Sequence, residues 1–89
     1  MIEKNVAVVN RLGLHARAAA RLVQLLSGFK ADAAITAKGR TVNGKSIMGV
    51  MLLAAGQGST VTLRLDGEDE AAAMDAAADL FARGFDEES

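Results

Sequence analysis

The chain has 89 residues, 51% of them hydrophobic, and a formal net charge of −1 at pH 7. This length predicts one domain over residues 1–89, and the apolar share is enough for one core. A near-neutral charge and only three aromatic residues, all phenylalanine, argue against a nucleic-acid-binding module, which needs a basic surface and rings for stacking. The absence of cysteine excludes disulfides and thiolate metal sites.

The N-terminal half reads as a strand followed by a helix. Residues 2–9 end in a β-branched run that predicts a buried strand, and residues 10–13 break it. From Ala16 onward the apolar residues recur at helical spacing, and Gly28 is a plausible helix end.

Two short strands are expected next, over residues 32–37 and 40–42. The pair between them, Lys38 and Gly39, is typical of a tight hairpin turn. We therefore expect these two strands to pair with each other.

The C-terminal half predicts a short helix, a strand and a longer helix. Ser46 is a suitable N-cap for a helix over residues 47–55, and residues 60–65 alternate as a half-buried strand does. Acidic residues 68–70 favour the start of a final helix, and Gly84 is suited to end it. The last residues, 86–89, are expected to fray.

The resulting element order is β-α-β-β-α-β-α, which predicts an α+β fold with one sheet and helices packed on one face. Sequence alone leaves the strand order open, and a ferredoxin-like sheet would satisfy the same elements. The longest apolar run, Val50 to Ala55, is far too short to span a bilayer, and the N-terminus lacks the features of a signal peptide. We expect a cytoplasmic monomer that binds neither membranes nor nucleic acid.

His15 is the only histidine, and it lies immediately before the predicted helix that begins at Ala16. A single histidine in a small domain is most often a surface or helix-capping residue. A metal site is not expected, because one histidine without cysteine does not complete a closed site. A serine-type triad is not expected either in so small a chain.

The surroundings of His15 favour phosphate chemistry. The amides of Ala16, Arg17 and Ala18 would be the unpaired donors of the first helical turn, where the helix dipole also favours anions. The Arg17 guanidinium matches phosphate oxygens, and Arg21 follows one turn later. No nucleotide-binding loop or magnesium-binding carboxylate cluster is apparent. We therefore expect a phosphoryl carrier without cofactor or metal, rather than an enzyme.

Two motifs make the expectation of a phosphoryl carrier more specific: "GLHARAAA" at residues 13–20 and "NGKSIMGVM" at residues 43–51. Together they resemble the HPr family, the histidine-containing phosphocarriers of the bacterial phosphotransferase system, and the resemblance covers essentially the whole chain. It implies an open-faced β-sandwich, in which three helices cover one face of a four-stranded antiparallel sheet. It also implies that His15 accepts a phosphoryl group through Nδ1 from phospho-enzyme I and passes it to IIA domains, with Arg17 steadying the phosphate.

The same resemblance implies regulation and a docking surface. Ser46 would be phosphorylated by HPr kinase/phosphorylase. The residues that would meet partner proteins come from two segments: Ala20, Arg21, Gln24, Ile47, Met48 and Met51. Met suits a surface that meets several partners.

Two positions depart from the family pattern. Ala18 stands where the family usually has proline, and we expect the first helical turn to survive because alanine suits a helix. Ala54 stands where the family usually has glycine at the end of the short helix, so we expect Gly56 to supply the stop instead. Two other functions compete with the carrier: a small acylphosphatase-like enzyme, and a pure protein-interaction or RNA-binding module.

Overall fold

The computed structural model describes residues 1–87. Its elements, in chain order, are β1 (Ile2–Ala7), α1 (Ala16–Ser27), β2 (Asp32–Ala37), β3 (Arg40–Asn43), α2 (Ile47–Leu52), β4 (Thr60–Asp66), α3 (Glu70–Ala82) and the 3₁₀ turn η1 (Gly84–Asp86). The predicted element order is confirmed. The first strand is two residues shorter than expected, and the short helix ends at Leu52 rather than at residue 55.

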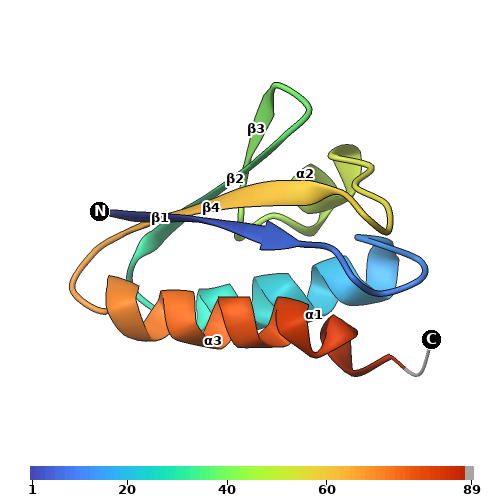
Figure 1. Cartoon of the computed structure of the whole chain (residues 1–89). Coiled ribbons are helices and arrows are strands. Elements are labelled where there is room, and N and C mark those ends of the chain that lie inside the picture. The colour runs from blue at the N-terminus through green and yellow to red at the C-terminus, as the bar shows by residue number, and fades with distance from the viewer. Residues whose placement is uncertain (88–89) are drawn as a thin grey trace.

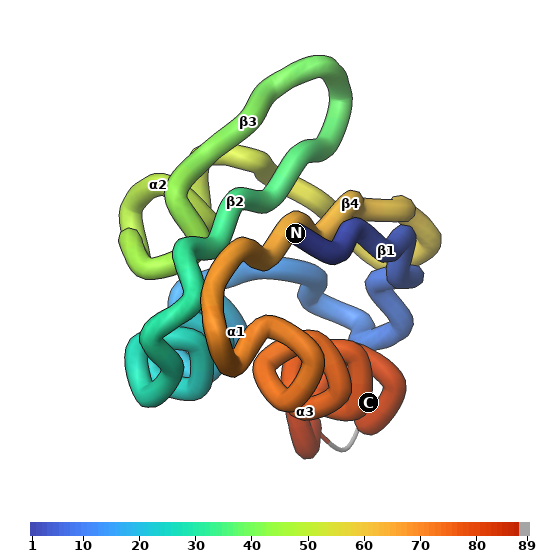
Figure 2. Tube along the Cα trace, turned by 90° about the vertical axis from the view of Figure 1, so that its left-hand side faces the viewer, coloured from blue at the N-terminus to red at the C-terminus, as the bar shows by residue number. Residues whose placement is uncertain are grey.

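The four strands form one sheet in the order β1-β4-β2-β3, and each neighbouring pair is antiparallel. This order resolves what the element string left open. Helices α1 and α3 lie side by side beneath the sheet, with α2 nearer the β2–β3 side (Figures 1 and 2). The open-faced α+β sandwich expected from the sequence is therefore confirmed. Among the described residues, no helix is both long enough and apolar enough to cross a bilayer.

The core lies between the sheet and the two long helices. In β4, Val61, Leu63 and Leu65 are buried, as their alternation with polar residues predicts. The side chains that α1 and α3 contribute to the same core are Ala18, Ala19, Leu22, Val23, Leu26, Ala73, Met74, Ala77, Leu80 and Phe81. Burying one stripe of each helix against one face of the sheet is what stabilises this arrangement.

The chain does not fray directly after α3, contrary to the sequence expectation for residues 86 and 87. Gly84 takes a left-handed conformation (φ 65°), and Phe85 then packs edge-on against Phe81 with ring centroids 4.8 Å apart. Phe85 is fully buried, and the Arg21 guanidinium donates a hydrogen bond to its carbonyl oxygen. These contacts hold the chain in place up to Glu87. The remaining part of the expected frayed end, residues 88–89, lies outside the described residues.

The end of α2 differs from the expectation that Gly56 supplies the stop. Leu53 is the C-cap, and Ala54 itself takes the left-handed conformation, with φ 50°. For an L-residue this conformation costs about 1–2 kcal/mol, which glycine avoids.

We therefore expect Ala54→Gly to stabilise the protein by about 1 kcal/mol, since the conformational cost is relieved and the exposed methyl group makes little packing contribution. Urea unfolding of both proteins measures the difference. Gly56→Ala is a suitable control, because an added Cβ there meets no atom within 4 Å and the backbone is not left-handed. A loss of stability in Ala54→Gly would contradict this account of the helix end.

Candidate functional site

His15 is the N-cap of α1, with an extended backbone (φ −77°, ψ −176°). The loop that carries it is attached to the segment after α2, because the Leu14 amide donates to the Ala55 carbonyl at 2.9 Å and the Leu14 side chain is buried. Gly13 has φ +67°, and a Cβ built on it would lie 2.3 Å from the Ala55 carbonyl oxygen. Only glycine fits at this position, so the sequence of the loop places His15 at the helix terminus.

Both nitrogens of the His15 ring have neighbours. Nδ1 accepts a long hydrogen bond from the Arg17 amide at 3.4 Å, so it faces the N-terminus of α1. Nε2 lies 2.6 Å from the Glu87 carboxylate oxygen Oε2. The imidazole side chain is 29% exposed, so solution reactants can still reach it. The capping role and the phosphoryl-acceptor role of His15 are therefore compatible in one geometry.

Glu87 was not predicted from the sequence as a site residue. Its side chain is only 9% exposed, and Oε1 accepts a hydrogen bond from the Asn10 side-chain amide at 2.8 Å. This hydrogen bond is the main reason that the pKa of Glu87 is lowered, and the neighbouring His15 and Arg17 lower it further against the effect of burial. The carboxylate is therefore ionised at neutral pH. The groups expected from the sequence, helix amides and the two arginines, did not include this carboxylate.

The phosphate-binding groups expected around His15 lie at the start of α1. Arg17 is exposed and forms no ion pair with another of residues 1–87. Ala16, Arg17 and Ala18 are the first three residues of the helix, whose amides have no acceptor one turn earlier. Ala18 is fully buried, so alanine at this position contributes to the core as well as to the helix start.

The first segment of the expected docking surface is only partly available. Gln24 is exposed and Ala20 is half-buried. Arg21 is also half-buried, and its hydrogen bond to the Phe85 carbonyl uses part of its guanidinium. In this structure Arg21 therefore attaches the C-terminal turn to α1.

Ser46 is the N-cap of α2, as predicted, and its hydroxyl accepts a hydrogen bond from the Gly49 amide at 3.1 Å. Behind it, Val50 is fully buried while Ile47, Met48 and Met51 are 41%, 73% and 42% exposed. The helix therefore has a buried inner face and an exposed outer face, and the three expected docking residues lie on the outer one.

Two exposed apolar residues beside this outer face were missed: Leu12 and Leu52. The helical spacing of Met48 and Leu52, four residues apart, could have indicated Leu52. No local pattern marks Leu12, which reaches this surface only because the His15 loop lies beside the end of α2. A depression of about 240 Å³ joins the two regions and is lined by Leu12, Leu14, His15, Met51, Ala54, Ala55 and Gly56. The apolar outer face of α2 therefore continues to the imidazole.

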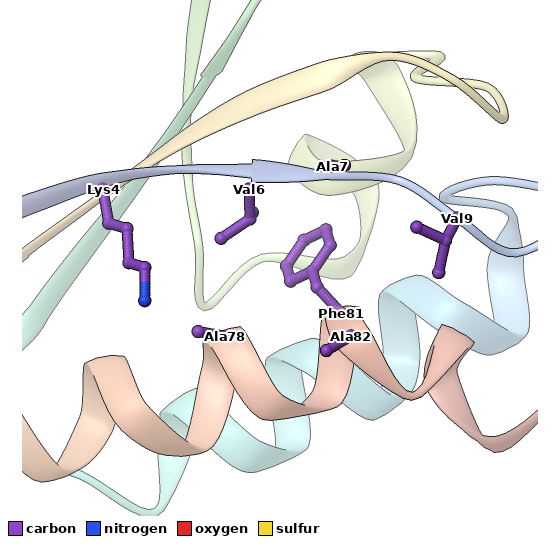
Figure 3. A pocket seen from close by; sticks show the side chains of 7 residues that line it. All are labelled: Lys4, Val6, Ala7, Val9, Ala78, Phe81 and Ala82. Carbon is purple, nitrogen blue, oxygen red and sulfur yellow. The ribbon is translucent and has the colours of Figure 1, made fainter.

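A second pocket, of about 390 Å³, lies between β1 and α3 (Figure 3). Its lining residues are Lys4, Val6, Ala7, Val9, Ala78, Phe81 and Ala82, and the Phe81 ring projects from α3 toward β1. Lys4 is the one titratable side chain in this lining, and it has no acid–base partner there. This pocket therefore offers no chemistry comparable to that of the His15 site.

Comparison with known proteins identifies the family of this chain. The family model described as "PTS HPr component phosphorylation site" matches residues 2–83. The phosphocarrier protein HPr of Xylella fastidiosa strain Temecula1 is 54% identical over 89 residues, which is 100% of each chain.

Solved structures give the same result. A crystal structure of HPr from Thermoanaerobacter tengcongensis superposes with a TM-score of 0.95 at 42% identity, covering 100% of each chain. An HPr dimer from the same organism has a TM-score of 0.78 at 41% identity, covering 98% of this chain and 100% of the other, so the monomer expected from the sequence stays a prediction. The protein is thus a carrier rather than an enzyme, and the chain belongs to the HPr family of phosphocarrier proteins of the phosphotransferase system.

Proposed function

We propose that this protein accepts a phosphoryl group on Nδ1 of His15 from phospho-enzyme I and passes it to IIA domains. The observation that carries the proposal is the direction of Nδ1, which faces the Arg17 amide at the N-terminus of α1. In the forward step, the Nδ1 lone pair forms a bond to phosphorus, and the bond between phosphorus and the donor breaks with its electron pair leaving on the donor. Transfer to a IIA domain reverses these roles.

The phosphoryl oxygens would be held by the chain itself. The amides of Ala16, Arg17 and Ala18 would donate to them, and the exposed Arg17 side chain would supply a guanidinium. No cofactor or metal takes part in this proposal. The reaction would take place in the cytoplasm, with the chain acting as a single-domain monomer.

Partner proteins would dock on the apolar face of α2 and the adjoining face of α1. The residues that the sequence predicts for this surface are Ala20, Arg21, Gln24, Ile47, Met48 and Met51, to which the structure suggests adding Leu12 and Leu52. Exposed apolar side chains rimmed by polar ones are typical of protein–protein interfaces. Their continuity with the depression at His15 would bring the partner's reactive group to the imidazole.

Phosphotransfer from purified enzyme I tests the proposal. With enzyme I and phosphoenolpyruvate, the protein should gain the mass of one phosphoryl group, and acid treatment should remove it because phosphohistidine is acid-labile. Subsequent addition of a IIA domain should transfer the group and restore the original mass. A protein that stays unmodified with active enzyme I would favour a pure protein-interaction module instead.

We further propose that phosphorylation of Ser46 by HPr kinase/phosphorylase regulates this transfer. A phosphate group there would add about −1.5 to −2 charges at the N-terminus of α2, beside the apolar residues Ile47 and Met48. An acidic partner surface would then be repelled, and an apolar contact would become harder to desolvate. Mass spectrometry after treatment with the kinase should find the modification on Ser46, and an unmodified serine would refute the regulation.

The substitution Ser46→Asp is expected to slow loading by enzyme I about tenfold or more, because it puts a negative charge in the docking surface. Initial rates of phosphoryl acceptance measure the effect. Ser46→Asn is the matched control, because asparagine caps a helix as well as aspartate without adding a charge. Equal rates for the two variants would show that charge at this position does not control docking.

A further inference from the structure

We propose that Glu87 is a positioning residue for phosphoryl transfer, whose carboxylate holds the His15 imidazole as the Nε2–H tautomer. The inference rests on the proposed function of His15 as the phosphoryl acceptor. In a neutral imidazole one nitrogen carries the proton and the other the lone pair. Because an ionised carboxylate only accepts hydrogen bonds, Oε2 at 2.6 Å requires the proton on Nε2. Nδ1 then keeps the lone pair that the reaction needs.

Asn10 determines how Glu87 meets the imidazole. The buried Asn10 amide nitrogen donates to the Gly13 carbonyl and to Glu87 Oε1, both at 2.8 Å. The reversed amide would set its oxygen against these two acceptors, so the observed orientation is the one the neighbours allow. The Asn10 oxygen is left buried without a hydrogen-bond partner among the described residues. Because both N–H groups of this amide are directed at fixed acceptors, the amide holds the Glu87 carboxylate in one orientation.

The C-terminal turn is built to bring Glu87 to this position. Phe85 and Asp86 both have left-handed backbones, with φ 59° and 61°, although neither is glycine. Such conformations are strained and persist where surrounding contacts impose them. Here the contacts are the buried Phe85 ring, the hydrogen bond from Arg21 to the Phe85 carbonyl, and the Glu87 amide donating to the Gly84 carbonyl at 3.1 Å. Residues from both ends of the chain thus converge on the imidazole.

The same carboxylate also acts during the reaction. When Nδ1 forms the bond to phosphorus, Nε2 keeps its proton, so the ring of the product gains positive charge. Glu87 Oε2 faces that charge directly, in a largely buried position where an opposite charge is more effective than in water. The carboxylate takes no proton and binds no phosphate, which makes it a positioning residue. In this role Glu87 resembles the aspartate of a catalytic triad, which holds the histidine in one tautomer and stabilises its positive charge.

The variants Glu87→Gln and Glu87→Ala separate this role from simple packing. In Glu87→Gln, Asn10 would still donate to the side-chain oxygen, which leaves the new amide NH₂ against Nε2 of His15. That NH₂ is a donor, so the imidazole proton should move to Nδ1 and block the nucleophile. Glu87→Ala only removes the carboxylate, so neither nitrogen of the imidazole is then favoured as the site of the proton by this side chain. We therefore expect phosphoryl acceptance to fall about 10–100-fold in Glu87→Gln and by less in Glu87→Ala, a smaller effect than in an enclosed triad because His15 is partly exposed.

The tautomer can be measured without any phosphotransfer. Long-range ¹H–¹⁵N correlation spectra of the unphosphorylated protein, recorded at alkaline pH where imidazole is neutral, report which nitrogen carries the proton. We expect it on Nε2 in the wild type and increasingly on Nδ1 in Glu87→Gln. Asp86→Asn is the matched control, because it removes one carboxylate charge from the residue next to Glu87. The Asp86 carboxylate pairs with Arg83 at 2.9 Å. It should keep the wild-type tautomer and rate.

The outcomes distinguish the two proposals. If the wild type is loaded by enzyme I while Glu87→Gln and Glu87→Ala keep its tautomer and rate, the role of Glu87 is overturned and the function of His15 stands. If the wild type accepts no phosphoryl group, the function fails and the role of Glu87 fails with it. A slow Glu87→Gln with the proton still on Nε2 would also overturn tautomer control.

Discussion

The substitution His15→Ala should abolish phosphoryl acceptance from enzyme I and leave the protein folded. The imidazole is the only histidine side chain, and it supplies the proposed nucleophile. It is partly exposed and contributes little to the core, so its removal mainly costs the N-cap of α1, about 1 kcal/mol. Mass spectrometry after incubation with enzyme I and phosphoenolpyruvate should find no added phosphoryl group, while circular dichroism should retain a cooperative melt.

His15→Asn is the matched control for the capping role. Asparagine is among the best N-cap residues, so this variant should recover most of the lost stability and still accept no phosphoryl group. The pair of variants thus separates the structural role of position 15 from its chemistry. An acid-labile phosphate on either variant would mean that another residue is the acceptor.

Gly13→Ala should give the largest loss of stability of the substitutions considered, about 2–5 kcal/mol. The left-handed backbone (φ +67°) costs alanine about 1–2 kcal/mol. In addition, its Cβ would lie 2.3 Å from the Ala55 carbonyl oxygen and 2.8 Å from the Gly56 Cα, both backbone atoms that cannot rotate away. Relieving this overlap adds about 1–3 kcal/mol. Urea unfolding measures the sum, and phosphoryl acceptance should fall too because the loop carries His15.

Gly39→Ala isolates the contribution of the steric overlap. Its backbone is also left-handed (φ +77°), but an added Cβ would meet no atom within 4 Å. This variant should lose only the conformational part, about 1–2 kcal/mol. If Gly13→Ala lost no more than Gly39→Ala, the close approach of the His15 loop to Ala55 would not be a real constraint.

The sequence by itself determined the features that depend on neighbouring residues. Alternation in residues 60–65 predicted β4, helical spacing after Ala16 predicted α1, and Ser46 was correctly predicted as an N-cap. These predictions succeeded because strand and helix periods, caps and turns are encoded within a few residues. The two motifs also indicated the family, which the comparisons confirm. The predicted end of α2 was wrong because Ala54 adopts a left-handed conformation that its own side chain disfavours.

Only the tertiary structure decided what surrounds the imidazole. Glu87 contacts His15 across 72 residues, and Asn10 contacts Glu87 across 77. No periodicity or spacing relates such positions, and the acidic residues near the C-terminus read as a solvated end. Glu87 reaches His15 because Phe85 is buried against Phe81 and its carbonyl oxygen accepts a hydrogen bond from Arg21. These two contacts direct the chain back over the start of α1. The sequence thus determined that a histidine precedes a helix beside an arginine, whereas packing of the two chain ends decided that a carboxylate faces Nε2 of that histidine.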